Sequence, residues 1–203
     1  MKFLEFKKAL KNKTIFNNSD IRKIAPTFHR KRLVDWQKAG YIIKIRNGYY
    51  CFKEQAEGEH FFWHMANQIY KPSYLSLTTA LSYYNLTPEA VFTQSSISTL
   101  KTASFKTAYG NFEYKNTKPA LFFGYRLIKL NGLTIKMAEP EKMILDYCYL
   151  IKPESIEHFK SLRIDCSAAR KLIDFDKLDA YLSIYSSKIM NLRVKLFKTY
   201  LNA

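Results

Sequence analysis

The sequence predicts an α+β fold in which a small N-terminal domain precedes a larger C-terminal one. Two observations lead to this prediction. Apolar residues recur at helical spacing up to Gly40, and a hairpin signal at Asn47-Gly48 follows them. Strand-like alternation then occupies the middle of the chain and gives way to helices again at Pro140. We therefore expect two domains, residues 1–53 and residues 54–203.

The first two helices are expected close to the N-terminus. Phe3, Phe6 and Leu10 share one helix face, with lysines on the other. The stretch "NNSDIRKIAP" predicts a second helix, in which Ser19 is the candidate N-cap and Pro26 forces the end.

A third helix is predicted in "FHRKRLVDWQKA", with Thr27 as its N-cap. Leu33 and Trp36 lie three residues apart on one face and are expected in the core. Gly40 is expected to end this helix as a C-terminal cap in the left-handed conformation.

The segments "YIIKI" and "YYCF" flank "RNG", which predicts a β-hairpin. Asn47-Gly48 favours a type I′ turn, because both central residues of that turn have positive φ. Helix, helix, turn, helix and hairpin is the layout of a winged helix-turn-helix. The full prediction is an N-terminal winged helix-turn-helix followed by a mixed α/β C-terminal domain with antiparallel hairpins and terminal helices.

The net charge of +16 is concentrated in the first domain. Residues 1–53 hold 14 Lys or Arg and 3 Asp or Glu, whereas residues 54–203 hold 19 and 14. A strongly cationic N-terminal segment, followed by a segment of lower net charge, is typical of nucleic-acid-binding proteins. A soluble basic protein whose lysines merely face water would show the same total charge, so the local layout decides between the two interpretations.

In a helix-turn-helix, the second helix enters the major groove with its N-terminal residues at the base edges, and a hairpin wing contacts the backbone or the minor groove. Any one cation here fits a solvated helix face equally well, and His29 fits either a phosphate contact or an exposed polar position. As a group, they favour DNA binding. The candidate DNA-binding residues are Thr27, His29, Arg30, Lys31, Arg32, Lys44, Arg46, Asn47 and Gly48.

The second domain is expected to alternate between helices and hairpins. A polar linker around Gly58 leads into the helix "HFFWHMANQIY", and a strand then runs into a helix capped near Ser76. Hairpins are predicted about Gly110 and about Asn131-Gly132. A helix starts at Pro140, and further helices fill the rest of the chain, the last of them amphipathic and basic.

No motif makes a positive case for an enzyme, a cofactor or a metal site. His60 and His64 share a helix face, but Phe61 stands where H-E-x-x-H requires Glu. Asp174 and Asp176 resemble a magnesium-holding pair without the upstream Gly-Ser turn of a nucleotidyltransferase, so Asp176 is interpreted as a helix cap.

Acidic residues near Pro140 do not form a convincing acid/base pair either. Glu141 and Asp146 are five residues apart and point away from each other on a helix. Helix capping and a buried salt bridge are the better interpretations of Glu139, Glu141 and Asp146.

The chain lacks an apolar run of membrane-spanning length, and its start lacks the apolar core of a signal peptide. The three cysteines are widely separated, which fits reduced thiols. We expect a cytoplasmic protein with no membrane partner.

Four segments follow one another along the chain: "RLVDWQKAGYIIKIRNGYY", "YLSLTTALSYYNL", "SFKTAYGNFEYKNTKPALFFGY" and "AEPEKMILDYCYL". Together they resemble the AbiEi family, the antitoxin and repressor partners in AbiE-type bacterial toxin–antitoxin pairs. The most specific parts are G-x-F-x-Y, starting at Gly110, and A-x-P-E-K, starting at Ala138. The winged-helix portion alone is shared by many regulators, and the last 50 or so residues match only in being helical and basic.

The resemblance implies a domain that binds promoter DNA and represses its own operon, and a second domain that counters a cognate nucleotidyltransferase toxin. It implies a recognition helix at Thr27–Arg32 and a wing at Lys44–Gly48, and it transfers no catalytic residue. The implied partners are double-stranded operator DNA with inverted repeats, bound by a monomer or dimer, and the toxin.

Three alternatives stay open. The chain is a winged-helix regulator without an antitoxin role, or an interaction module that acts only on a partner protein. The third, a metal-dependent nuclease or transferase, would need Asp174 or Asp176 for its activity.

Overall fold

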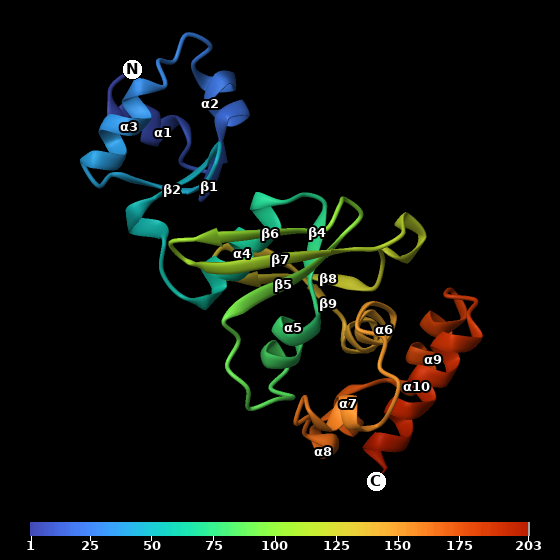
Figure 1. The fold of residues 1–203 in the computed structure, drawn as a ribbon. Helices are drawn as coiled ribbons and strands as arrows, with labels where there is room; N and C mark the ends of the chain where they lie inside the picture. Colours follow the sequence, from blue (N-terminus) through green and yellow to red (C-terminus); the bar gives the residue numbers. More distant parts are fainter. Residues whose placement is uncertain (203) are drawn as a thin grey trace.

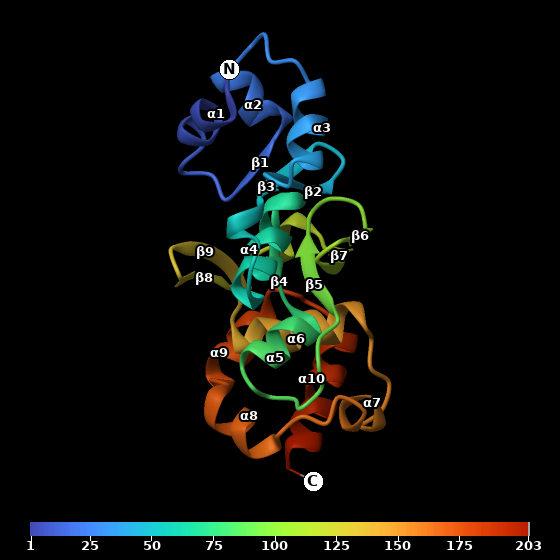
Figure 2. The same ribbon diagram turned by 90° about the vertical axis from the view of Figure 1, so that its left-hand side faces the viewer.

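The structure is a computed structural model that describes residues 1–202, and it has the α+β architecture that the sequence predicts. We call residues 1–53 the head and residues 54–202 the body. The head lies at one end of the molecule and the C-terminal helices lie at the other, so the two chain termini are far apart (Figures 1 and 2).

The head contains three helices and a three-stranded antiparallel sheet in the order β1-β3-β2. The sequence did not predict β1, which is only three residues long and pairs with residues far along the chain. The elements are α1 (Phe3–Ala9), β1 (Ile15–Asn17), α2 (Asn18–Ile24), α3 (Lys31–Lys38), β2 (Ile42–Arg46) and β3 (Tyr49–Phe52). The 3-10 turn η1 (Lys53–Gln55) joins the head to the body.

Both predicted helix N-caps in the head are wrong. The N-cap of α2 is Asn17 rather than Ser19, because the Asn17 side chain accepts from the amides of Ser19 and Asp20 at 2.8 and 3.1 Å. Helix α3 begins at Lys31, four residues after Thr27, so Thr27 lies in the preceding turn. The end of α3 is as predicted, with Gly40 at φ +71°.

The hairpin forms where predicted but with a different turn. Gly48 has φ +79°, whereas Asn47 is not at positive φ, so the turn is not type I′. The register shifts between Lys44 and Arg46, and this bulge accommodates the extra residue.

The body is built on a six-stranded mixed sheet in the order β6-β7-β5-β4-β9-β8. Strand β4 runs antiparallel to β5 and parallel to β9, and β5 runs parallel to β7. The strands are β4 (Ser73–Leu75), β5 (Thr93–Ser98), β6 (Ala103–Thr107), β7 (Gly110–Asn116), β8 (Tyr125–Leu130) and β9 (Leu133–Ala138).

Helices cover both faces of this sheet, which is why β4 and β5 are buried along almost their whole length. On one face, the Tyr114 hydroxyl donates to the carbonyl of Ala66 in α4 at 2.7 Å. On the other, the Tyr74 hydroxyl donates to Asp146 in α6 at 3.0 Å. The helices are α4 (Glu59–Ile69), α5 (Leu77–Tyr83), α6 (Pro140–Leu150), α7 (Glu157–Lys160), α8 (Cys166–Leu172), α9 (Phe175–Ser183) and α10 (Lys188–Leu201), with a 3-10 turn η2 (Pro119–Leu121).

Several local predictions in the body are confirmed. Pro140 occupies the first turn of α6, and Asn131 and Gly132 both have positive φ between β8 and β9. The predicted cap of α9 is wrong by two residues: Asp174, not Asp176, accepts from the amide of Lys177 at 3.0 Å.

The small sheet of the head is shared between two cores. Side chains alternate along a strand, so Phe16, Tyr50 and Phe52 pack among the head helices. The alternate residues Ile15, Ile45 and Cys51 belong to the core of the body. Figures 1 and 2 show this sheet between the head helices and the body. The head is therefore packed onto the body by a buried apolar contact.

Candidate nucleic-acid interface

An aromatic core fixes the orientation of α3. The Trp36 ring lies 4.8 Å from the Phe6 ring and 5.6 Å from the Phe28 ring, measured between centroids. Leu33 is buried beside them. Because these residues occupy the inner face of α3, the outer face turns to solvent.

The turn before α3 is anchored by one of its own residues. Phe28 stacks on Phe6 at 5.5 Å, and its neighbours Thr27 and His29 are exposed. The backbone amide of Arg32 donates to the carbonyl of His29 at 3.1 Å, so the turn leads directly into the helix. In both ribbon views this turn lies at the end of the head farthest from the body (Figures 1 and 2).

Exposed cations gather at this end. Arg30, Lys31 and Arg32 are all exposed, and none of the three forms an ion pair within residues 1–202. Arg32 donates from Nη1 to the carbonyl of Met1 at 2.6 Å. This contact brings the N-terminus of the chain, and Lys2 with it, beside α3. No sequence pattern indicates that contact, because it joins residues 31 positions apart.

The acidic residues of the head are largely engaged elsewhere. Glu5 accepts from the Lys2 amide at 2.8 Å, and Asp20 accepts from the Asn17 amide and pairs with Lys13 at 3.2 Å. Asp35 is left as the acid on the exposed face of α3. The end of the head therefore carries a net positive potential.

The hairpin residues are not gathered with this cluster. Lys44 and Asn47 are exposed, but Arg46 is half-buried and faces the body. Its guanidinium donates to the carbonyl of Ile69 at 3.0 Å and lies 4.0 Å from the centroid of the Phe105 ring. The Gly48 carbonyl accepts from the Asn18 amide at 3.2 Å. The hairpin end is thus held between α2 and the body.

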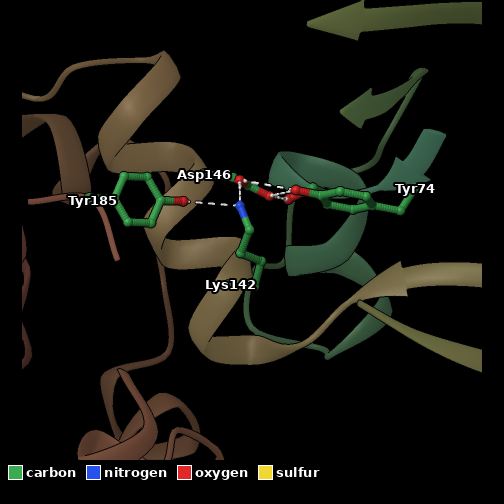
Figure 3. Close-up of polar contacts among 5 residues, drawn as sticks. Tyr74, Lys142, Asp146 and Tyr185 are labelled. Carbon is green, nitrogen blue, oxygen red and sulfur yellow. Dashed lines mark hydrogen bonds and ion pairs between the residues drawn. The ribbon is translucent and has the colours of Figure 1, made fainter. Parts of the chain in front are cut away.

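A second gathering of titratable groups lies inside the body (Figure 3). Lys142 and Asp146, which are 0% and 1% exposed, form an ion pair one turn apart on α6. Tyr74 and Ser76 donate to Asp146 at 3.0 and 2.8 Å, and the Lys142 ammonium donates to the Tyr185 hydroxyl at 3.0 Å. The predicted buried salt bridge is confirmed for Asp146.

The environment of this cluster perturbs its pKa values. Burial raises the pKa of Asp146, against the attraction of Lys142 and the hydrogen bonds from Ser76 and Tyr74. Burial and the neighbouring Asp146 carboxyl also raise the pKa of Tyr74. Because neither Lys142 nor Asp146 has appreciable contact with solvent, we interpret the cluster as structural.

The other acids of α6 bind a lysine from α9. Lys177 lies 3.1 Å from Glu139 and 3.4 Å from Glu141, and the Tyr181 hydroxyl donates to Glu139 at 2.7 Å. Burial would raise the pKa of Glu139, but the hydrogen bonds from Tyr181 and Lys177 outweigh it and lower the pKa. These contacts join α6 to α9.

The two histidines of α4 do not converge on a shared site. His64 contacts the carbonyl of Thr134 through Nδ1 at 2.9 Å, and His60 lies against the Trp63 ring. Within residues 1–202, no group of three potential ligands could hold a metal ion. None of the helices described is both long and apolar enough to cross a membrane.

A scan against protein-family models finds no match, and a search of curated proteins finds no significant match.

Proposed function

We propose that this chain is a DNA-binding repressor of its own operon that also acts as an antitoxin against a nucleotidyltransferase toxin. The DNA-binding part is carried by one observation: exposed cations without acidic partners gather at the start of α3, on the free end of the head. Phosphates are the ligands that such a cluster attracts most strongly.

The order of elements in the head supports a winged helix-turn-helix as the reader. Helix α3 follows α2 after a short turn, and two strands follow α3. In that fold the start of α3 faces the major groove. Arg30 and Lys31 would contact guanine edges or phosphates, and Thr27 and His29 would contact the adjacent backbone. Arg32 would add a phosphate contact beside them, and the exposed Lys44 would add a separate one from the hairpin.

The hairpin contributes less to this interface than its sequence suggests. We leave Arg46 out because its guanidinium already binds the body. Gly48 remains beside α2 and could contact DNA only through its backbone, whereas the exposed Asn47 side chain could reach a phosphate. Two heads, from a dimer or from cooperating monomers, would read a site with inverted repeats.

The antitoxin part of the proposal is supported by the four segments that resemble the AbiEi family, of which three lie in the body. A winged-helix regulator without an antitoxin role is the second candidate, because the features of the head favour it equally.

We expect the Arg30→Ala/Lys31→Ala double variant to bind its own upstream DNA at least about thirty-fold more weakly, since each side chain removed from a base or phosphate costs roughly 1–3 kcal/mol and two are removed. The slope of log affinity against log salt should also flatten, by about 0.9 for each phosphate that the variant no longer neutralises. Fluorescence anisotropy with a labelled duplex measures both quantities.

The matched control is Lys129→Ala/Lys171→Ala, which removes two exposed cations from the body. It should leave the affinity within about two-fold of the original chain, because neither residue lies near α3. If the two double variants weaken binding equally, net charge alone drives binding and the assignment of the interface fails.

The antitoxin role is tested by co-expression with the nucleotidyltransferase proposed to be encoded beside it. We expect the Arg30→Ala/Lys31→Ala variant to protect cells while failing to repress a reporter under its own promoter. A wild-type chain that represses but does not protect would establish the second candidate instead. Point variants are preferable to deletion of the head, because Ile15, Ile45 and Cys51 form part of the core of the body.

A further inference from the structure

A groove of about 460 Å³ opens on the body where four segments meet. It lies between the end of α6, the η2 turn, the loop after α9 and the start of α10. The rings of Tyr149 and Tyr185 line it, 5.6 Å apart between centroids. In Figure 1, α9 and α10 lie at the edge of the body farthest from the head, so this groove is separate from the proposed DNA interface.

Exposed aliphatic side chains extend the groove along α10. Ile184 and Ile189 line it, and Leu192 follows Ile189 by three residues on the same helix face. Ile189 and Leu192 are 59% and 63% exposed. Single exposed apolar residues are ordinary, but a strip continuous with a groove is typical of a surface that another molecule covers.

The rim of the groove is positively charged. Lys118, Lys152 and Arg193 line it, and Lys188 begins α10 beside it. None of the described residues that line the groove is acidic. Arg193 is held in place by donating from Nη1 to the carbonyl of Cys148 at 3.2 Å. An apolar floor inside a basic rim selects for a partner with an apolar stripe and acidic flanks.

We propose that this groove docks an acidic amphipathic helix of a partner protein. The apolar strip runs from Ile184 after α9 to Ile189 and Leu192 on α10, as a helix-in-groove interface would use, and a small ligand in the groove would leave Leu192 uncovered. A nucleic acid would gain phosphate contacts from the lysines but nothing from the isoleucines. A second copy of this chain, with a net charge of +16, would be repelled by the basic rim.

This inference goes beyond the proposed repressor and antitoxin functions and does not rest on either of them. The groove would bind an acidic amphipathic helix of a partner protein whether or not the head binds DNA.

The test uses the full-length chain and a labelled synthetic peptide of about 16 residues, which is long enough for about four turns of amphipathic helix. The peptide carries Leu at positions i, i+3 and i+7 and Glu on the remaining faces. We expect it to bind, and we expect Ile189→Ser/Leu192→Ser to weaken binding at least about ten-fold, because those side chains supply the apolar contact. Lys152→Glu should weaken binding as well, through like-charge repulsion with the peptide.

Two controls separate this groove from general attraction to a basic protein. A shuffled peptide of the same composition should bind at least about ten-fold more weakly, because its leucines do not share a face. Leu127→Ser removes an equally exposed leucine from β8 and should leave peptide binding unchanged, as should Arg30→Ala/Lys31→Ala. Thermal unfolding verifies that each variant is folded.

The proposal is overturned if the amphipathic peptide does not bind, if the shuffled peptide binds equally well, or if Ile189→Ser/Leu192→Ser has no effect. It is also overturned if sedimentation shows a dimer that this variant dissociates, since the occupant would then be a second copy. If single-stranded DNA displaces the peptide, and Ile189→Ser/Leu192→Ser also weakens the binding of that DNA, the groove would be assigned to nucleic acid instead.

Discussion

Replacing Asp146 with alanine is expected to destabilise the protein by about 3–5 kcal/mol, the range for breaking a buried ion pair from one side. The substitution leaves the Lys142 ammonium without a counter-ion in a fully buried position. It also removes the acceptor for the Tyr74 and Ser76 hydroxyls. Urea denaturation followed by circular dichroism measures the decrease in the free energy of unfolding.

Two further variants separate charge from packing. The double substitution Lys142→Met/Asp146→Leu should recover much of the stability, because no buried charge remains unpaired. Asp179→Ala breaks the exposed Lys198–Asp179 pair and should cost less than about 1 kcal/mol. If Asp146→Ala is as mild as Asp179→Ala, the buried cluster does not stabilise the body.

Ile45→Asp should destabilise both head and body, by at least about 3 kcal/mol. Ile45 is 3% exposed and belongs to the core of the body although it lies on β2 of the head. The variant removes a buried aliphatic side chain and places a carboxylate among apolar neighbours. The hydrogen bond from Arg46 to the Ile69 carbonyl is not enough by itself to hold the head on the body.

Differential scanning calorimetry checks this prediction. The unsubstituted chain should unfold in a single transition, because the buried contact couples its two parts. Leu127→Asp, at an exposed position on β8, is the control and should change the melting temperature little. A head that unfolds alone in the Ile45→Asp variant, with the body transition unchanged, would contradict this coupling.

Features determined by neighbouring residues could be predicted from the sequence. Gly40 ends α3, Pro140 starts α6, and Asn131-Gly132 makes the turn between β8 and β9. Each depends on a backbone preference that one or two residues express wherever they occur. The Asn47-Gly48 turn shows the limit of this reasoning, because pairing with β3 and contact with α2 select a bulged turn instead.

Features that depend on distant pairing could not be predicted. Strand β1 exists only through its pairing with β3, and its three residues carry no clear pattern. The sequence predicted a buried salt bridge for Asp146 without naming a partner. Tyr74 and Ser76, which donate to it, lie about 70 residues earlier in the chain, so spacing on α6 could not indicate them. From the sequence, both hairpin cations, Lys44 and Arg46, were expected to contact DNA, because no pattern in it indicates that Arg46 faces Phe105.

The buried face of α3 could be predicted because it depends on helix periodicity. Leu33 and Trp36 set the inner face of α3, and the exposure of Lys31 on the opposite face follows from it. Arg30 is exposed because it precedes the first residue of the helix. The contribution of the N-terminus could not be predicted, because the contact from Arg32 to Met1 is a tertiary one.

The affinity of the full-length chain for its own upstream DNA, compared with a shuffled duplex of the same length and composition, tests the repressor proposal most directly. Both affinities should be measured at the same salt concentration, because phosphate contacts alone attract any duplex to so basic a protein. We expect the upstream DNA to bind at least about 1000-fold more tightly, as specific readers of DNA do. Equal affinities for the two duplexes would contradict the proposal that the head reads an operator.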